Sequence, residues 1–191
     1  MKKWFISFFF LLILFIGTLI VGINIRFPVR YMSIIEDNAG DIDPSWILAV
    51  IMAESSFRPH AESHVGAQGL MQLMPSTAEW VAGLMGMDDF EPHMIWDPEV
   101  NIALGSFYLN RLMQMYNGNL SLALAAYNAG QGNVNRWLAD PDISSDGTNL
   151  DVIPFNETYN YLRRVTFNQR VYEIVLRFNG FLGIGGARDG R

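Results

Sequence analysis

Hydrophobic residues fill the first part of this chain and recur at helical spacing through most of the rest. After Met1-Lys2-Lys3, the segment from Trp4 to Ile25 contains 22 residues without a charge, and most of them are apolar. At 1.5 Å per residue, a helix of this length crosses the hydrocarbon core of a bilayer. The pattern therefore predicts a transmembrane helix within residues 1–25, with residues 4–25 in contact with the membrane.

A cleaved signal peptide is the alternative for this segment, because two lysines precede an apolar core. The apolar run is long for such a peptide, and no small-residue cleavage site follows it. We therefore favour an uncleaved anchor. Lys2 and Lys3 predict a cytoplasmic N-terminus with the remaining chain outside, although Arg26 and Arg30 place positive charge on the other flank as well.

A second apolar pattern begins after Asp43-Pro44, which is typical of a helix N-cap and first turn. Glu54 and three apolar residues before it share the i, i+3, i+4, i+7 spacing of one helix face: Ile47, Val50 and Ile51. A carboxyl group at the buried end of such a face is costly to ionise, so we expect its pKa to be raised. A general acid needs this property. The alternative is that Glu54 lies at the helix rim, solvated or paired with an arginine.

Similar patterns predict further helices after a short one within residues 27–40. The expected ranges are 75–85, 98–116, 120–127, 132–138 and 156–178. Asp97-Pro98 repeats the N-cap signal, residues 128–130 are expected to interrupt a helix, and residues 58–68 and 140–151 are expected to be loops. No alternating strand pattern is visible. The expected fold class is mostly α, with one domain behind the apolar segment.

Composition narrows the classes of function. Both lysines precede the apolar segment, and the region after it carries 11 Arg against 19 Asp and Glu, a formal charge of −8. This charge argues against nucleic acid as a partner and against strong attraction to anionic lipids or wall polymers. The absence of cysteine excludes a thiol nucleophile and a Cys-ligated zinc site. His60, His64 and His93 share no metal-ligand spacing, so we expect neither metal nor cofactor.

Four short motifs follow one another along the chain. They are Glu54-Ser55, Gly69-Leu70-Met71-Gln72, Ala126-Tyr127-Asn128-Ala129-Gly130, and Ile153-Pro154-Phe155-Asn156-Glu157-Thr158 with Tyr161 after it. Each alone is a weak signal, but four in this order with compatible spacing are specific. From about Ile42 to Phe178 the chain resembles the catalytic domain of the soluble lytic transglycosylases, a family related in fold to goose-type lysozyme.

The resemblance implies a lysozyme-like catalytic domain that cleaves the MurNAc-β-1,4-GlcNAc bond of peptidoglycan glycan strands. Glycoside hydrolysis usually needs two carboxylates, but the motifs offer one well-placed acid, Glu54. The resemblance implies that this one glutamate first protonates the glycosidic oxygen and then, as a base, deprotonates the C6 hydroxyl of the muramic acid. That hydroxyl attacks C1 and closes a 1,6-anhydro ring, so no water is consumed.

The resemblance also assigns residues around Glu54. It places Tyr127 near the acid, where the hydroxyl can stabilise charge, and it assigns a set of residues to glycan binding: Ser55, Met71, Gln72, Asn128 and Glu157. Some of these have a structural alternative. Ser55 can bond to its own helix backbone, Asn128 suits a left-handed residue at a helix break, and a first-turn glutamate at position 157 complements the helix dipole.

Two positions depart from the family pattern. Tyr159 stands where relatives often carry the arginine of Glu-Thr-Arg, although Arg163 and Arg164 lie one turn further on. Any function that this arginine has in the relatives is therefore not expected for this chain. Gln131 stands where proline is common after Asn-Ala-Gly, which should only loosen the entry to the next helix.

The predicted organisation is an anchor at 1–25, a juxtamembrane segment at 26–41, a lytic transglycosylase domain at 42–179 and a disordered Gly-rich tail at 180–191. The chain is then a single-pass protein of the bacterial cytoplasmic membrane with an extracytoplasmic domain; the sequence identifies no partner in the cell-wall machinery. Two alternatives stay open. One is a hydrolytic lysozyme with Glu62 or Glu157 as second carboxylate, and the other is an inactive wall-binding scaffold, which the intact Glu54 disfavours.

Overall fold

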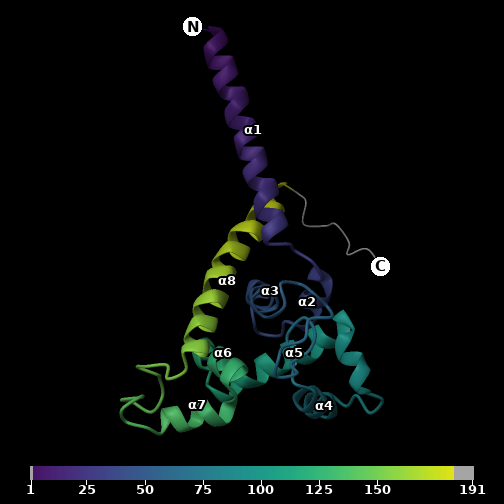
Figure 1. Cartoon of the computed structure of the whole chain (residues 1–191), viewed down its shortest axis with the longest axis vertical. Helices are drawn as coiled ribbons and strands as arrows, with labels where there is room; N and C mark the ends of the chain where they lie inside the picture. The colour runs from purple at the N-terminus through teal and green to yellow at the C-terminus, as the bar shows by residue number, and fades with distance from the viewer. Residues whose placement is uncertain (1, 183–191) are drawn as a thin grey trace. The chain divides into compact units, whose positions relative to one another are not determined.

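The computed structural model describes residues 2–182, and they fold into a succession of helices (Figure 1). Within these residues, β-structure is limited to isolated bridges that pair Gln68 with Glu62 and with Leu73. The expected mostly α fold class is confirmed. The chain divides into two compact units, one up to Arg30 and one from Tyr31 onward.

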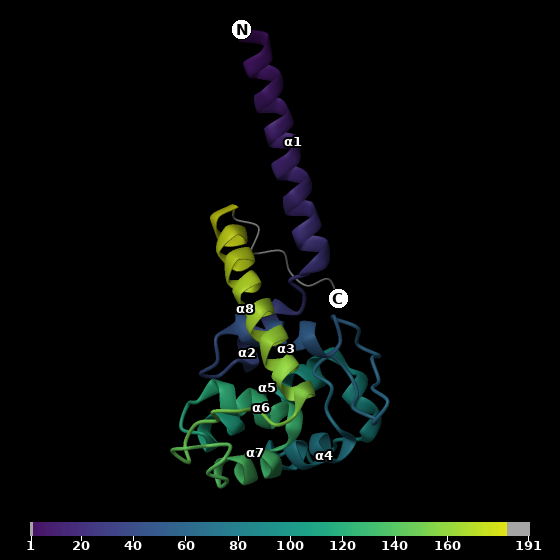
Figure 2. The ribbon, with the colours of Figure 1, turned by 60° about the vertical axis from the view of Figure 1, so that its left-hand side comes forward.

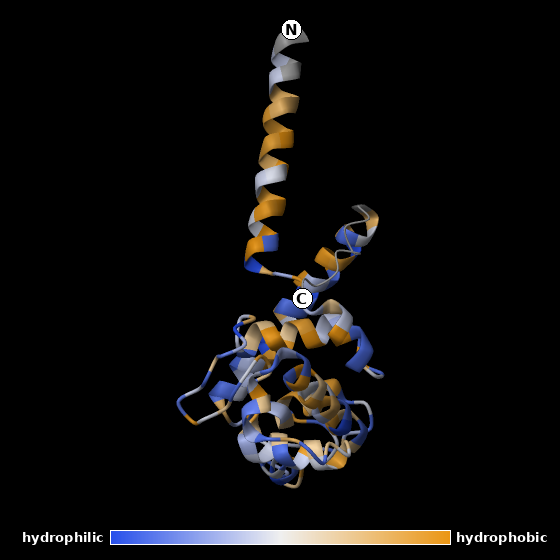
Figure 3. Cartoon of the chain, turned by 90° about the vertical axis from the view of Figure 1, so that its right-hand side faces the viewer, coloured by the Kyte–Doolittle hydropathy of each residue, from blue (hydrophilic) through white to orange (hydrophobic). Residues whose placement is uncertain are grey.

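The first unit contains α1, Lys2–Arg26, whose residues are hydrophobic along most of its length (Figure 3). In the described part of the chain it is the one helix long and apolar enough to cross a membrane, over Ser7–Arg26, with a mean hydropathy of 2.7 and none of that window buried in protein. A helix that is apolar on all sides is suited to lipid. A cleaved signal peptide would form the same kind of helix, so the anchor stays a prediction.

The second unit contains the other helices. They are α2 Met32–Asn38, α3 Pro44–Glu54, α4 Pro75–Leu84, the 3₁₀ helix η1 Pro92–Trp96, α5 Pro98–Met115, α6 Leu120–Ala129, α7 Gln131–Leu138 and α8 Asn156–Leu182. The expected starts of α4 to α8 agree with these bounds within one residue.

Two of the expected N-caps are confirmed. One carboxylate oxygen of Asp43 accepts a hydrogen bond of 2.9 Å from the backbone N–H of Ser45 at the start of α3. Asp97 caps α5 in the same way, because its Oδ1 accepts from the N–H groups of Glu99 and Val100 at 2.9 and 3.1 Å. Each cap satisfies backbone donors that the first turn of a helix leaves without a partner.

Helix α3 forms the centre of this unit. The residues from Ile47 to Ile51 are completely buried, so the helix is enclosed on all sides and not only along the expected stripe. Helix α8 packs against α3, and the two helices are neighbours in both Figure 1 and Figure 2. Gln169 of α8 donates to the Ser45 hydroxyl at 3.2 Å, and Asn168 donates to the Ala49 carbonyl at 3.4 Å. The C-terminal end of α3, where Glu54 lies, is therefore fixed by the core.

Two expectations about the helices were wrong, and one short helix was missed. Residues 128 and 129 belong to α6, and the break comes at Gly130, whose φ of 85° suits a residue without a side chain. Gly180 to Leu182 continue α8, so the helix runs past the glycine at which we expected it to end; the rest of the expected tail, residues 183–191, lies outside the described residues. The 3₁₀ helix η1 was not anticipated, since five residues are too few to show a period.

Asn101 of α5 fixes the connection between α3 and α4. The side chain is buried, its Oδ1 accepts from the Met71 N–H at 2.7 Å, and its Nδ2 donates to the carbonyls of Ile95 and Gln68 at 2.8 and 3.2 Å. Gly69 has a φ of 83°, and a Cβ there would lie 2.1 Å from the Asn101 Nδ2. The glycine is therefore required for the loop to approach α5 this closely.

We expect Asn101→Ala to destabilise the detergent-solubilised chain by about 2–4 kcal/mol, because a buried N–H and two carbonyls lose their partner. The measurement is the free energy of unfolding in urea. Asn160→Ala, at an exposed position of α8, is the control and should change it by less than about 0.5 kcal/mol. Equal effects of the two substitutions would show that Asn101 does not have this role.

Candidate active site

Glu54 is the last residue of α3 and lies partly buried where this enclosed helix ends. Burial raises the pKa of its carboxyl group to about 7, because the ionised form loses its hydration. The Tyr161 hydroxyl and the positive charge of Arg164 oppose this rise, and the negative charge of Glu157 adds to it. The expectation of a raised pKa is confirmed, and near neutral pH the group is present in both its acid and its base form.

The chain leaves α3 through an unusual turn directly after Glu54. Ser56 and Phe57 both have left-handed backbone conformations, with φ values of 53° and 59°. Such values are costly for residues with a side chain, by about 1–3 kcal/mol each. The buried Phe57 ring compensates by packing edge-on against Tyr172 of α8, with 6.4 Å between the ring centroids. This turn leaves Glu54 at the end of the helix and directs the following loop away from it.

Helix α8 brings three polar groups to the carboxyl group. The Tyr161 hydroxyl is buried beside Glu54 and influences its pKa. The distance and angles do not meet the criteria of a regular hydrogen bond. Among the described residues, the Tyr161 hydroxyl is the buried side-chain polar group that has no hydrogen-bond partner. The Arg164 guanidinium lies 6.0 Å from the centre of the Tyr161 ring, and Glu157 lies exposed one turn before Tyr161.

Helix α6 contributes Tyr127. Its hydroxyl donates a hydrogen bond of 2.8 Å to the Met71 carbonyl. Burial, together with the negative charge of Glu54, holds the pKa of Tyr127 well above its ordinary value, so the phenol stays neutral. Since the charge of Glu54 acts on this hydroxyl, the two side chains are neighbours, as the sequence had led us to expect.

Tyr127 begins a row of aromatic rings that the sequence analysis missed. Its ring centroid lies 5.4 Å from that of Tyr108 on α5, and Tyr108 contacts Trp80 of α4 edge-on at 6.0 Å. Trp80 is 42 % exposed, and the Arg111 guanidinium lies 5.6 Å from the centre of its ring. The signal in the sequence was an aromatic residue on each of two amphipathic helices, which is equally typical of core residues.

Gln72 has a left-handed backbone, with φ of 49°, and its side chain folds back on the loop. The amide Nε2 donates to the carbonyls of Ala61 and Gly69 at 2.8 and 2.9 Å. Both N–H bonds are therefore used inside the protein. Only the Oε1 of this side chain is left to contact a ligand.

Two of the expected glycan-binding residues point into the protein. Ser55 is 1 % exposed, and its hydroxyl donates to the Ile51 carbonyl at 3.1 Å, which is the structural alternative. Met71 has no exposed surface, and its sulfur lies where a Cβ on Gly105 would come within 2.4 Å of it. Neither side chain is available to a sugar in this arrangement. Met74, two residues after this motif, is 40 % exposed and is therefore the accessible thioether of this segment.

Asn128 is bound to the first turn of α8, the turn that contains Glu157. The Asn128 Oδ1 accepts a hydrogen bond of 2.8 Å from the buried hydroxyl of Thr158, next to Glu157 in the sequence. The Asn128 amide nitrogen keeps its donors. Tyr159, at the position of the missing arginine, has the Arg163 guanidinium 5.8 Å from the centre of its ring.

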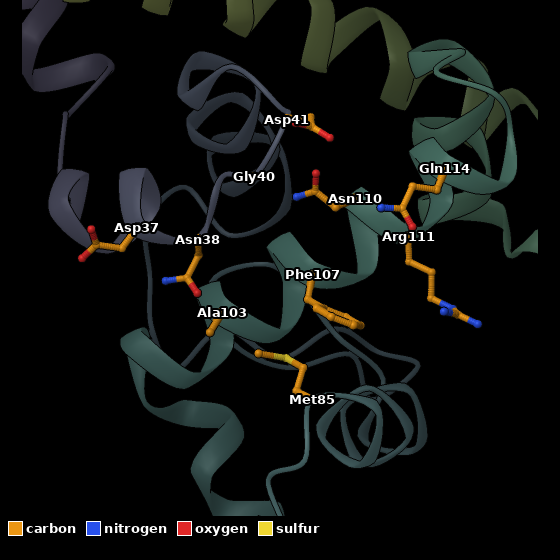
Figure 4. A pocket seen from close by; sticks show the side chains of 10 residues that line it. All are labelled: Asp37, Asn38, Gly40, Asp41, Met85, Ala103, Phe107, Asn110, Arg111 and Gln114. Atoms are coloured by element: carbon orange, nitrogen blue, oxygen red, sulfur yellow. The ribbon is translucent and has the colours of Figure 1, made fainter.

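A surface cavity of about 380 Å³ lies apart from these residues, between the segment after α2 and the outer face of α5 (Figure 4). The Asn110 amide lies in its wall and donates to the carbonyls of Ala39 and Ser106 at 2.9 and 3.0 Å, so it connects α2 to α5. None of the expected site residues lines this cavity. Within the described residues, no group of three or more His, Cys, Asp or Glu side chains could hold a metal ion.

A helical domain built around one desolvated glutamate is typical of the lysozyme-like class of proteins. The family model described as the transglycosylase SLT domain matches residues 32–148, more than half of the chain. The chain belongs to this family.

The named relatives of this chain include lytic murein transglycosylases. The chain is 37 % identical over 144 residues to the soluble lytic murein transglycosylase of Salmonella typhimurium, covering 73 % of this chain and 22 % of that protein. It is 32 % identical over 170 residues to the membrane-bound lytic murein transglycosylase C of Histophilus somni, covering 76 % and 47 %. The matched regions thus span about a fifth of the first relative and about half of the second.

A solved structure gives the same result for the fold. The lytic transglycosylase Slt of Pseudomonas aeruginosa, solved as an inactive mutant with glutamine in place of a glutamate, matches with a TM-score of 0.70 and 37 % identity. The match covers 81 % of this chain and 25 % of that one. The lysozyme-like fold that the motifs implied is confirmed.

The raised pKa of Glu54 makes stability depend on pH. With a pKa of about 7 in the folded state against 4.5 for the free group, the folded state binds the proton more tightly. The stability that this proton confers is complete below pH 4.5 and is lost as the pH rises to 7, by up to about 3 kcal/mol. Glu54→Gln should therefore be more stable than the natural chain at pH 8 and equal to it at pH 4.

The measurement is urea unfolding of both proteins at the two pH values. Glu79→Gln on the exposed face of α4 controls for the removal of a carboxylate. A difference between the Glu54→Gln protein and the natural chain that is the same at pH 4 and pH 8 would contradict the desolvation of Glu54.

Proposed function

We propose that this chain is a peptidoglycan lytic transglycosylase that cleaves the MurNAc-β-1,4-GlcNAc bond without water. The observation that carries the proposal is a single glutamate whose pKa, raised to about 7 by burial, makes it both an acid and a base near neutral pH. Family membership and the names of the relatives support the same reaction. So does the Pseudomonas aeruginosa relative, which is inactive with glutamine in place of a glutamate.

The reaction needs Glu54 twice. The protonated carboxyl group gives its proton to the glycosidic oxygen as the bond from that oxygen to C1 of the MurNAc breaks. The resulting carboxylate then takes the proton of the C6 hydroxyl of the same sugar while that oxygen bonds to C1. The glutamate ends protonated as it began, and the product is a 1,6-anhydro-MurNAc end.

The two tyrosines suit the intermediate stage, when Glu54 is ionised. Burial holds the pKa of Tyr161 well above its ordinary value, so its hydroxyl stays neutral and keeps a proton to donate to the Glu54 carboxylate. Arg164 adds a positive charge nearby. The Tyr127 proton is bonded to the Met71 carbonyl, so Tyr127 gives the carboxylate no hydrogen bond; its oxygen suits instead the positive charge that develops at C1 as the glycosidic bond breaks.

Substrate contacts fall to the groups that the fold leaves available. These are the Gln72 Oε1, the Asn128 amide nitrogen, the exposed Glu157 carboxylate and the exposed Met74 thioether. We assign Ser55 and Met71 a positioning role, because Ser55 closes the last turn of α3 and the Met71 carbonyl holds Tyr127.

The hydrolytic alternative needs a second carboxylate that activates water. Glu157 is the acid whose charge acts on Glu54, but it lies exposed at the first turn of α8. Glu62 is bridged to Gln68, whose Nε2 lies 3.5 Å from one of its carboxylate oxygens. These placements favour the reaction with one carboxylate. A scaffold without activity would have no use for a desolvated acid.

We also propose that α1 is an uncleaved, single-pass anchor in the bacterial cytoplasmic membrane, with the catalytic domain outside. Its length and apolar character support the anchor, and membrane-bound relatives exist. Lys2 and Lys3 support a cytoplasmic N-terminus. The substrate lies outside that membrane, which favours the same orientation.

Digestion of purified cell wall tests the reaction. We expect each new MurNAc end to be one water lighter by mass than a hydrolysed end, because the acceptor is the C6 hydroxyl. We expect Glu54→Gln to lower the rate by a hundred-fold to ten-thousand-fold, since both proton transfers use this carboxyl group.

Glu62→Gln is the matched control and should keep the rate and the anhydro product. Reducing MurNAc ends as the main product would show that water is the acceptor and that the chain is a lysozyme. Retention of a tenth of the rate by the Glu54→Gln protein would remove Glu54 from the mechanism.

Membrane extraction tests the anchor. The expressed chain should stay in the membrane fraction at alkaline pH in carbonate, because a spanning helix cannot be released by breaking electrostatic contacts. Its intact mass should include residues 1–25. A mature protein that begins near residue 26 and is soluble would show that the segment is a cleaved signal peptide.

A further inference from the structure

Helix α8 carries a second stripe of residues, away from the core, that the proposed reaction does not use. Its members follow one another at intervals of three or four along one helix face, apart from the adjacent pair at 177 and 178. They are Arg163, Phe167, Arg170, Ile174, Arg177, Phe178 and Phe181. We call this set the basic–apolar stripe.

The large apolar members of the stripe are exposed, three of them by more than half of their surface. Phe167 is 61 % exposed, Ile174 69 %, Phe178 38 % and Phe181 86 %. The buried hydrophobic residues of α8 lie on the opposite face: Tyr161, Val165, Tyr172 and Val175. Beyond Val175 none of the side chains described on α8 is buried, so the last two turns extend past the core. A row of exposed phenylalanines on one helix face is unfavourable in water and indicates a partner surface.

The charge of the stripe is opposite to that of its surroundings. Helix α8 has four arginines against two glutamates, in a region whose formal charge is −8. The stripe has three of those arginines and no acidic residue. From the formal charge of the region we argued against strong attraction to anionic lipids, but that total does not describe the charge of this face. At its N-terminal end the stripe borders a shallow cavity of about 420 Å³, with Arg163, Phe167 and Arg170 in its wall.

We propose that the basic–apolar stripe binds an anionic lipid surface. The guanidinium groups contact lipid phosphates, and the phenylalanine and isoleucine side chains enter the boundary between headgroups and acyl chains. An amphipathic helix with arginine on its polar edge and aromatic residues on its apolar face is suited to this position. A soluble polyanion would use the arginines but would leave the phenylalanines in water.

The proposal rests on the proposed membrane span of α1. Residues 27–31 connect α1 to α2, and five residues reach at most about 18 Å when fully extended. If α1 spans the bilayer, this tether keeps the domain at the membrane surface, where even a weak contact of α8 becomes intramolecular. The contact then fixes the direction in which Glu54 faces the wall.

The experiment uses the full chain in lipid nanodiscs. Since the natural sequence has no cysteine, one environment-sensitive fluorophore can be placed on Ile174→Cys, and on Val65→Cys as a control of similar exposure (61 %) in the loop after α3. We expect the probe at 174 to report an apolar environment and reduced quenching by an aqueous quencher in anionic nanodiscs, and much less so in zwitterionic ones. The probe at 65 should report water in both.

Charge-reversal substitutions of the stripe arginines are the second test of the proposal. Each arginine near an anionic surface contributes about 1 kcal/mol, which is about fivefold in the bound fraction. Arg170→Glu and Arg177→Glu should therefore each lower the lipid-bound to free ratio at position 174 at least about fivefold. Arg136→Glu on α7, exposed and outside the stripe, should leave it unchanged.

A probe at 174 that reports water in both lipids overturns the proposal. So does an apolar signal that is independent of lipid charge and rises with protein concentration, because this would indicate a second copy as the partner. A fluorophore on Ile13→Cys in α1 distinguishes failure of the stripe from failure of the anchor. If the probe at 13 reports lipid while the probe at 174 reports water, the membrane anchor is retained and lipid binding by the stripe is refuted. Wall digestion by the same labelled proteins tests the enzyme independently.

Discussion

The fold depends on an enclosed helix that ends in a carboxylic acid. Residues 47 to 51 of α3 have no contact with water, and Glu54 follows within a turn, so its carboxyl group shares in the desolvation of the core. An ionised group in such a place is stabilised only by the polar groups that surround it. Helix α8 meets this need, because it packs against α3 and brings the Tyr161 hydroxyl and the Arg164 charge to the acid. The raised pKa is thus a consequence of packing.

The loop between α3 and α4 faces a different constraint, since isolated bridges pair only part of its backbone. The buried amide of Asn101 binds the Met71 N–H, and the Tyr127 hydroxyl binds the Met71 carbonyl. Buried polar networks of this kind select one conformation when every member has a partner. The cost is that Met71 becomes a core residue. The loop in return fixes the orientation of the Gln72 amide, whose nitrogen is bonded to two carbonyls of the same loop.

Helix α8 serves the two proposed activities with opposite faces. One face is part of the core and supplies Tyr161, while the other carries arginines between exposed phenylalanines. The formal charge of −8 hid this second face, because a sum over the chain does not say where charges lie. A helix that connects the acid to a lipid surface would couple the position of the domain to its reaction. The reach of the enzyme into the wall would then be set by α8 as well as by α1.

The sequence alone determined the features that depend on residues a few positions apart. The helix starts, the caps at Asp43 and Asp97 and the acid at the end of an apolar stripe follow from hydrogen bonds and periodicity within one or two turns. The tertiary structure decided which side chains of the motifs face a substrate. Met71 meets Asn101 and Tyr127 across 30 and 56 residues, and Thr158 meets Asn128 across 30. Met71 was assigned to the substrate, and Asn101 and Tyr108 were missed, because no local pattern reports contacts between segments so distant in the chain. For Ser55 the local alternative, a hydrogen bond to the Ile51 carbonyl, was visible in the sequence, and the structure selects it.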